Sequence, residues 1–262
     1  MDGLRSRLNR GELVLGQMVL ELFTPGIGPM LAACGLDFVI FDMEHGRCDI
    51  QLLAEMIASC RGSNITTIAR VPDVEYAPLS RVLDLGARGV MVPRVETRAQ
   101  AEHVVAQLKY APQGQRGVAL GIAHDLYQAG TPDFFAKANE EITVILLLET
   151  ARAFDNLDDI ISVPGVDVAW MGHYDLTVSM GIPAQFDHPR FLEAMDNLVA
   201  VSRKHGVAPG FLPPDASSAS NWVRKGFRAI SLGSDIGVFL NGVRSFRSTV
   251  LENTRPTKEI KK

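Results

Sequence analysis

The feature that most constrains the fold is a strand-like segment followed by a helix-like one, repeated eight times along the chain. The strand-like segments are four to six residues long and mostly apolar, as expected for strands buried on both faces. They are residues 14–19, 38–41, 65–69, 89–92, 143–148, 168–171, 207–211 and 227–232. This alternation is typical of an α/β protein with a parallel sheet, and eight units predict closure into a (β/α)8 TIM barrel.

An open, doubly wound sheet is the alternative architecture. Dinucleotide-binding sheets of that type carry G-x-G-x-x-G directly after the first strand. Gly26-Ile27-Gly28 lacks the third glycine, and helix packing explains this pair better than a phosphate loop. We therefore predict one barrel domain over residues 1–262, with a lead-in helix over residues 2–10 and a frayed tail from about residue 253.

Local signals predict where helices begin and where loops lie. Thr24-Pro25, Asp49 and Thr97 are residue types that begin helices. Residues 110–139 are predicted to be a long irregular excursion, and residues 172–183 a second loop. Long connections of this kind often carry function.

Composition and charge exclude several classes of protein. The chain has 30 acidic and 26 basic residues, so a nucleic-acid-binding surface is not expected. Its start has no apolar signal segment, and no stretch approaches the ~18 apolar residues of a membrane span, so we predict a cytoplasmic protein. Cys34, Cys48 and Cys60 have no C-x-x-C spacing, which argues against zinc and disulfides and favours buried, inert thiols.

Polar side chains gather where four of the predicted strands end. The carboxyl ends of the strands form the active-site face of such a barrel, so these residues are expected to converge on one rim. They are Asp42, Glu44 and His45 after the second strand, Arg70 after the third, Glu149 after the fifth and Asp175 after the sixth.

Glu149 and Asp175 are the candidate metal ligands. They come from neighbouring strands and offer hard carboxylate oxygens without any cysteine, which favours Mg²⁺ or Mn²⁺ over structural zinc; Co²⁺ is a further candidate. Taken singly, each acid could instead cap a helix.

Arg70 and His45 are the candidate catalytic residues. A guanidinium at the barrel mouth suits a substrate carboxylate, although an ion pair with Asp42 or Glu44 is the alternative. His45 suits a general base, although a lone histidine is often only a packed core residue. Asp42 is expected to orient the imidazole through its second nitrogen.

Segments along most of the chain resemble the HpcH/HpaI family of class II pyruvate aldolases, which split and form 4-hydroxy-2-oxoacids. The matching segments are FVIFDMEHG, ARVP, LDLGARGVMVPRVETRAQAEHVV, YAPQGQRGV, LLLETARAFDNLDDI, VDVAWMGHYDLTVSMG and SLGSD. The resemblance implies a barrel of the phosphoenolpyruvate/pyruvate-domain type. It also implies a homohexamer, a trimer of dimers that exchange C-terminal helices, for which residues 236–251 have suitable apolar groups.

The resemblance also implies a role for each rim residue. Glu149 and Asp175 would bind the cation that chelates the 2-oxo acid, and backbone amides near Gly172 and Asp175 would hold the substrate carboxylate. Arg70 would steady the keto oxygen and the developing enolate. His45 would move the proton, directly or through water, supported by Asp42 and by Asp84 from a neighbouring subunit. None of the seven lysines ends a predicted strand, which favours a metal over a Schiff base.

The chain departs from the family pattern around the acceptor. Gly172-His173-Tyr174-Asp175 replaces the common Gly-Pro-Ala-Asp, Leu147 stands where a glutamine is frequent, and residues 121–125 lack an arginine expected to meet an acidic aldehyde. The acceptor pocket is predicted to include His124, His173, Tyr174 and Leu212, although altered packing would also explain the histidine and tyrosine replacements.

Three functions follow from these residues. The leading prediction is a metal-dependent aldolase that releases pyruvate, or a close 2-oxo acid, and an aldehyde. The second is a citrate-synthase-like enzyme or other lyase of this fold that acts on oxaloacetate or a thioester. The third, from a different class, is a non-catalytic protein that binds a 2-oxo acid.

Overall fold

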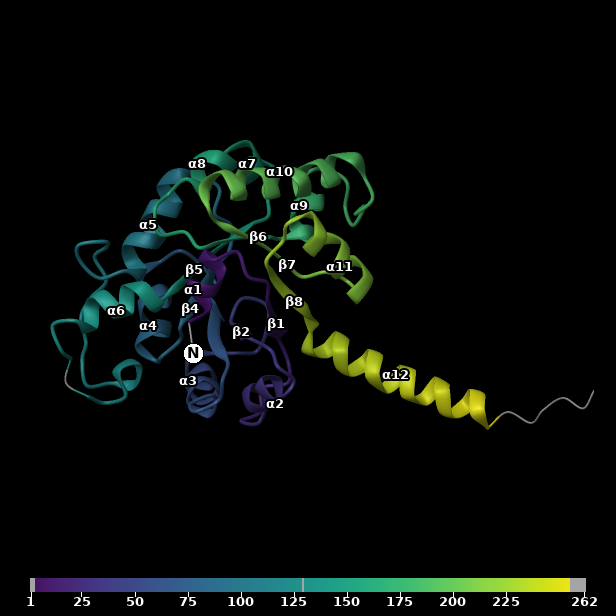
Figure 1. The fold of residues 1–262 in the computed structure, drawn as a ribbon, viewed down its shortest axis with the longest axis horizontal. Helices are drawn as coiled ribbons and strands as arrows, with labels where there is room; N and C mark the ends of the chain where they lie inside the picture. Colours follow the sequence, from purple (N-terminus) through teal and green to yellow (C-terminus); the bar gives the residue numbers. More distant parts are fainter. Residues whose placement is uncertain (1–2, 129, 255–262) are drawn as a thin grey trace, which may run out of the picture.

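The computed structural model describes residues 3–128 and 130–254. Eight parallel strands close into a barrel in sequence order, with β8 paired to β1, and helices surround it (Figure 1). The strands are β1 (Val14–Val19), β2 (Phe38–Asp42), β3 (Thr66–Arg70), β4 (Gly89–Val92), β5 (Thr143–Leu148), β6 (Val168–Met171), β7 (Ala208–Phe211) and β8 (Ala229–Ser234). The predicted TIM barrel is confirmed.

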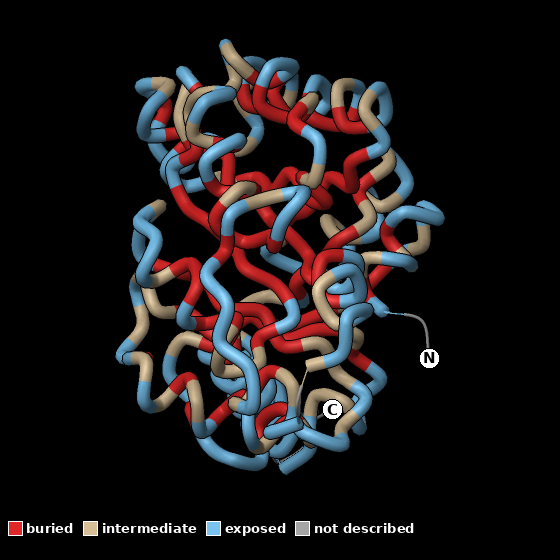
Figure 2. The backbone as a smooth tube through the Cα atoms, turned by 90° about the vertical axis from the view of Figure 1, so that its left-hand side faces the viewer, coloured by how far each residue is buried: buried red, intermediate tan, exposed pale blue. Residues whose placement is uncertain are grey.

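Side chains along each strand point alternately into the barrel and toward the helices, which gives two apolar layers. In β2, Phe38 and Ile40 point into the barrel, whereas Val39 and Phe41 pack outward against the helices. Buried backbone accordingly runs through the centre of the molecule, with exposed segments around it (Figure 2). Gly16 leaves room for the ring of Phe38, because a Cβ at this position would lie 2.3 Å from the ring carbons.

The helices follow the strands as predicted in most places. They are α1 (Leu4–Asn9), α2 (Ile27–Ala33), α3 (Ile50–Ser59), α4 (Tyr76–Asp84), α5 (Arg98–Leu108), α6 (Phe134–Glu141), α7 (Ala151–Asp155), α8 (Leu157–Ile161), α9 (His173–Ser179), α10 (Pro189–His205), α11 (Ala216–Lys225) and α12 (Asp235–Asn253). Asp49 caps α3 by accepting the Leu52 amide at 2.8 Å, and Thr97 caps α5 in a capping box with Gln100.

Two segments predicted as loops contain helices. The excursion holds the 3-10 helix η1 (Ala123–Asp125) and most of α6, and the second loop contains α9. The sequence of α9 is rich in aromatic and β-branched residues, which are weak helix formers, so tertiary packing of Leu176 and Thr177 stabilises it instead. Thr24 was expected to cap α2, but the N-cap residue of that helix is Gly26.

The lead-in helix α1 closes the amino-terminal end of the barrel. Leu4 and Leu8 join the cluster that fills the barrel interior, and Arg5 forms an ion pair with Asp167 at 2.6 Å. The opposite, carboxyl-terminal end is left for polar residues. This is the end at which the candidate site was predicted.

Helix α12 projects away from the barrel at the other end of the chain (Figure 1). Its apolar side chains are largely exposed, Phe239 at 57% and Phe246 at 76%. The predicted frayed tail lies mostly outside the described residues, which end at residue 254. Within the described part of the chain, no helix is both long and apolar enough to span a membrane.

The three cysteines are free thiols. Cys48 and Cys60 are buried, as predicted, and burial raises the pKa of the Cys48 thiol to about 12. Cys34 is exposed, because it ends α2 on the solvent side. The prediction of a buried thiol was therefore wrong for Cys34.

Candidate active site

Asp42 is the fully buried residue that fixes Arg70. Its carboxylate accepts hydrogen bonds from Arg70 Nε at 2.7 Å and Nη2 at 2.6 Å, a bidentate pair between the ends of β2 and β3. It also accepts the backbone amides of Glu44 at 2.9 Å and His45 at 3.3 Å. Asp42 therefore holds the backbone of the turn that carries His45. The prediction that it orients the imidazole is corrected, because Arg70 and these amides occupy its oxygens.

Glu44 lies between Arg70 and His45. Its Oε2 is 3.3 Å from Arg70 Nη1 and 3.8 Å from His45 Nε2, and the His45 side chain is 60% exposed. Among the described residues, no donor makes a hydrogen bond to this buried oxygen. Burial raises the pKa of Glu44, and the positive charge of Arg70 opposes that rise. The carboxylate beside the imidazole is thus Glu44, which the sequence suggested only as an ion-pair partner of Arg70.

Glu149 is a buried carboxyl group at the end of β5. Its Oε1 accepts the Arg94 amide at 2.8 Å, and Gly172 leaves room for it, because a Cβ there would lie 2.7 Å from Oε2. Burial raises the pKa of Glu149 to about 7; the charges of Glu44 and Asp175 add to the rise, while the Arg94 amide and Arg70 oppose it. A cation at this position would relieve the repulsion between these carboxylates.

Asp175 lies in the first turn of α9, exposed at the rim beyond β6. The predicted role of the Gly172 amide is corrected, because this amide donates to the Leu148 carbonyl at 3.0 Å within the barrel. No side chain of the described chain caps α9. Its first amides, those of Tyr174 and Asp175 included, therefore point toward the rim without a capping partner.

His173 is a packed residue and Tyr174 an exposed one. The His173 ring lies 5.3 Å from that of Phe186 and 5.2 Å from that of Phe211, and burial lowers its pKa to about 4 although Asp175 opposes the shift. Tyr174 covers the same cluster at 62% exposure. His173 is thus a neutral aromatic group that packs against phenylalanine rings, whereas Tyr174 is exposed at the rim, where it could contact a substrate.

The floor of the site is apolar. Leu147 lies one inward position below Glu149 on β5 and joins the interior cluster with Trp170, its neighbour on β6. Leu212, directly after β7, packs partly buried against the same cluster. A hydrophobic surface therefore lies beneath the carboxylates, which strengthens electrostatic interactions above it.

Asp84 and His124 lie at the opposite end of the barrel. Asp84 ends α4, just before β4 begins, and accepts Arg116 Nη2 at 2.6 Å. His124 is buried with its Nε2 2.7 Å from the Ala119 carbonyl, beside a cavity of about 190 Å³ that Gly86 and Arg88 also line. The prediction that His124 lines the acceptor pocket is not met within one chain. Only a second copy could bring either residue to the rim.

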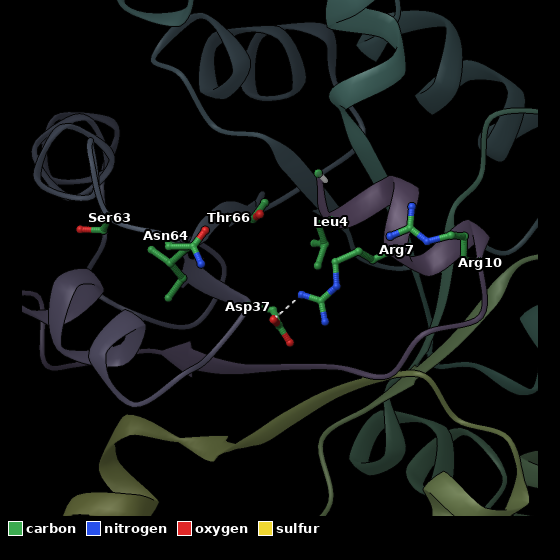
Figure 3. A pocket seen from close by; sticks show the side chains of 9 residues that line it. Leu4, Arg7, Arg10, Asp37, Ser63, Asn64 and Thr66 are labelled. Carbon is green, nitrogen blue, oxygen red and sulfur yellow. Dashed lines mark hydrogen bonds and ion pairs between the residues drawn. The ribbon is translucent and has the colours of Figure 1, made fainter. Parts of the chain in front are cut away.

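A cavity of about 480 Å³ also lies at the amino-terminal end, between α1 and the starts of β2 and β3 (Figure 3). Figure 3 shows Arg7 directed toward Asp37, with which it forms an ion pair. Arg7 also contacts Glu12 at 2.9 Å, so its charge is already balanced. This cavity is separate from the rim residues and is not the candidate active site.

The rim therefore combines two kinds of charge. The negative charges are those of Glu149 and Asp175, and the other groups at these strand ends are the fixed guanidinium of Arg70 and the exposed imidazole of His45, above an apolar floor. No cluster of three or more histidine, cysteine, aspartate or glutamate side chains within residues 3–128 and 130–254 is arranged to hold a metal. Two carboxylates suit Mg²⁺ or Mn²⁺, since these ions retain waters and bind substrate oxygens. The arrangement is suited to stabilising a developing negative charge.

Comparison with known proteins identifies the family. A family model described as HpcH/HpaI aldolase/citrate lyase matches residues 18–242. The chain belongs to this family. The resemblance drawn from the sequence segments is confirmed.

Several known proteins resemble the chain over most of its length. The 5-keto-4-deoxy-D-glucarate aldolase of Salmonella arizonae is 33% identical over 229 residues, which cover 87% of this chain and 89% of that protein. The HpcH/HpaI aldolase from Desulfitobacterium hafniense DCB-2 superposes with a TM-score of 0.91 at 27% identity, covering 98% of both chains. Citrate synthase SbnG superposes with a TM-score of 0.85 at 31% identity, covering 96% of this chain and 98% of that chain. The prediction of a carbon–carbon lyase is confirmed.

Proposed function

We propose that the protein is a divalent-cation-dependent aldolase that makes or breaks the carbon–carbon bond of a 4-hydroxy-2-oxoacid. Pyruvate, or a close 2-oxo acid, and an aldehyde would be the products of cleavage. The observation that carries the proposal is the rim itself, where Arg70 is fixed by Asp42 opposite Glu149 and Asp175. Similarity to a 5-keto-4-deoxy-D-glucarate aldolase supports the reaction class.

Glu149 and Asp175 would hold the cation, Mg²⁺ or Mn²⁺ with Co²⁺ as a further candidate. Both offer carboxylate oxygens. Burial, with the charges of Glu44 and Asp175 adding to it, raises the pKa of Glu149, and a bound cation would favour the ionised form of this carboxylate. When bound, the ion would supply positive charge to the oxygens of the 2-oxo acid while the enolate forms.

The side chains of the rim divide the remaining tasks. Arg70, held in one orientation, would donate to the keto oxygen without losing conformational freedom at that moment. His45 is exposed and would accept or return the proton, with Glu44 beside its Nε2 stabilising the imidazolium. Uncapped amides in the first turn of α9, including those of Tyr174 and Asp175, would hold the substrate carboxylate. Tyr174 and Leu212 would border the acceptor.

Condensation of oxaloacetate with a thioester is the second candidate function. Similarity to citrate synthase SbnG at 31% identity favours it over other reactions of the fold. A non-catalytic 2-oxo-acid-binding protein is the remaining alternative, and it would keep ligand binding without turnover.

We further propose a homohexamer, a trimer of dimers, in which α12 packs against a neighbouring barrel. The exposed apolar side chains of α12, with Phe246 at 76% exposure, would be buried by such an exchange. The same assembly would allow Asp84 of one chain to approach His45 of another. A cytoplasmic location stays a prediction.

A cleavage assay separates these functions. The purified chain is incubated with 4-hydroxy-2-oxopentanoate and Mn²⁺, and pyruvate release is followed with a coupled dehydrogenase. Release that stops on chelation and returns with Mn²⁺ supports the aldolase. Activity only with oxaloacetate and an acyl thioester would favour the second candidate, and ligand binding without turnover of any substrate would favour the third.

A further inference from the structure

Asp235 is a buried carboxylate, 5% exposed, to which the proposed mechanism gives no task. It is the first residue of α12 and follows β8 directly, at the carboxyl-terminal end of the barrel. Its Oδ1 accepts the Leu20 amide at 3.0 Å, and its Oδ2 accepts the amides of Glu21 at 3.0 Å and Leu22 at 2.6 Å. These donors form the segment directly after β1, residues 20–22, which we call the β1 loop. Hydrogen bonds to an ionised carboxylate are stronger than those to a neutral acceptor, so Asp235 fixes the backbone of this loop.

An irregularity at the end of β8 brings Asp235 to the β1 loop. The register of β8 against β1 shifts near this end, and Gly233 has a φ of 88°, in the left-handed region that favours glycine. The buried side chain of Gln17 donates to the Gly233 carbonyl at 2.7 Å and holds the irregular backbone in place. Ser234 caps α12 by accepting the Gly237 amide at 3.1 Å. The carboxylate of Asp235 is therefore not needed as the cap and serves the loop instead.

The β1 loop lies against the turn that carries His45. The Leu20 carbonyl approaches Gly46 so closely that a Cβ on this glycine would lie 2.7 Å from the carbonyl oxygen. Arg47, the next residue, has its Nε 3.8 Å from Glu21 Oε1. Both side chains of this ion pair are exposed, so it contributes little, and the close backbone contact at Gly46 is the stronger link.

His45 is thus held through its backbone from two sides. Asp42 accepts the His45 amide directly, at 3.3 Å, and Asp235 acts on the following residue through Leu20. The His45 side chain is 60% exposed, so the backbone of its turn, rather than packing around the ring, sets the position of the imidazole.

We propose that Asp235 is a positioning residue for His45, because it keeps the β1 loop against Gly46 and thereby keeps the imidazole where it can move a proton of the substrate. This inference rests on the proposed aldolase function, in which His45 moves that proton. A displacement of a catalytic group by about 1 Å can lower a rate roughly 100-fold. Asp235 acts on the loop after β1, whereas Glu149 follows β5, which lies opposite β1 in the strand order of the closed barrel. Loss of Asp235 should therefore impair proton transfer and leave the binding of Mn²⁺ and pyruvate intact.

Exchange of the pyruvate methyl protons in deuterated water, with Mn²⁺ present, separates these effects. In Asp235→Asn one carboxylate oxygen becomes an NH₂ group that cannot accept, so at least one loop amide loses its acceptor. We expect the exchange rate at saturating pyruvate to fall roughly 10- to 100-fold, while the KM for pyruvate and the affinity for Mn²⁺ stay at wild-type values. Gly46→Ala crowds the same contact from the other side and should give the same separation, which provides a second test if Asp235→Asn does not fold.

Asp167→Asn is the matched control. Asp167 is also 5% exposed and also accepts a backbone amide, that of Val144 at 2.8 Å, but it pairs with Arg5 at the opposite end of the barrel. The control should lose stability and keep the wild-type exchange rate below its unfolding temperature.

A double variant shows whether Asp235 acts through His45. In a His45→Ala background, Asp235→Asn should leave the residual exchange rate unchanged, whereas a general structural role would lower it further. A wild-type rate in both Asp235→Asn and Gly46→Ala, an equal fall in Asp167→Asn, or a further fall in the double variant would each overturn the positioning role. Absence of exchange in the wild-type protein would instead contradict the aldolase function, so the two failures are distinguishable.

Discussion

Replacing Asp42 by alanine should be among the most damaging single changes in the protein. Asp42 is 0% exposed and accepts four hydrogen bonds, two of them from the guanidinium of Arg70. The substitution leaves Arg70, itself only 8% exposed, without its bidentate partner. Removing one member of a buried ion pair destabilises a protein by about 3–5 kcal/mol. For a chain of this size this corresponds to a fall in Tm of roughly 6 °C or more.

Calorimetric unfolding at fixed protein concentration measures this effect. Asp158→Ala is the matched control, because Asp158 also pairs with a cation, Lys204 at 2.7 Å, but on the surface, where ion pairs contribute little. It should leave Tm unchanged within error. A fall in Tm for Asp42→Ala as small as that of Asp158→Ala would refute the reasoning.

A double variant tests the cause of the effect. Asp42→Ala/Arg70→Met removes both charges, so no unpaired guanidinium remains buried. It should unfold at a higher temperature than Asp42→Ala alone, although neither variant should be active. If the double variant were the less stable of the two, lost packing rather than an unpaired charge would be the cause.

The other predictions concern Glu149 and its surroundings. Because the pKa of Glu149 is raised to about 7, a proton should compete with Mn²⁺ for its carboxylate. The affinity of the protein for Mn²⁺, measured by calorimetry, should fall about tenfold per pH unit below pH 7 and level off above it. An affinity that does not change with pH would contradict this. In the metal-free protein, Glu149 binds more protons in the folded state than in the unfolded state between pH 4.5 and about 7. Its contribution to the free energy of unfolding should therefore decrease as the pH rises through this window, which urea unfolding at several pH values measures. Gly172→Ala should lower Mn²⁺ affinity roughly 10- to 100-fold, because the added Cβ would lie 2.4 Å from Glu149 Cβ; Gly242→Ala, at a position with open space, should not, and equal affinities would contradict the crowding argument.

The barrel could be predicted from the sequence because its strands are buried on both faces. Thr143–Leu148 is apolar after its first residue, and Val14–Val19 is apolar except for Gly16 and the buried Gln17; the observed limits of both strands are those predicted. Helices with little apolar periodicity were harder to recognise. The seven residues of α9 include only two that are buried, so their sequence resembles a loop.

The rim residues could be predicted because parallel strands bring their carboxyl ends together. That rule places Asp42, Arg70 and Glu149 on one face without knowledge of distances. It does not reveal which groups pair, since hydrogen bonds of a few ångströms decide this. Asp42 therefore turned out to serve Arg70 and backbone amides, while Glu44 lies beside the imidazole.

Two further differences have the same origin. The position of His124 depends on the path of an irregular excursion, which periodicity does not encode. Arg94, whose amide donates to Glu149 Oε1 at 2.8 Å, was overlooked because Pro93 marked the end of a strand, although the rule that identified Arg70 applies equally to it. A charged residue directly after a barrel strand was the signal that could have found it.

Exchange of the pyruvate methyl protons in deuterated water, followed by NMR with Mn²⁺ present and after chelation, tests the central claim most directly. We expect exchange with Mn²⁺ that chelation abolishes, that Glu149→Gln lacks, and that His45→Ala suppresses while pyruvate still binds. Exchange that persists after thorough chelation, or at the wild-type rate in Glu149→Gln, would contradict the assignment of the cation to Glu149 and Asp175.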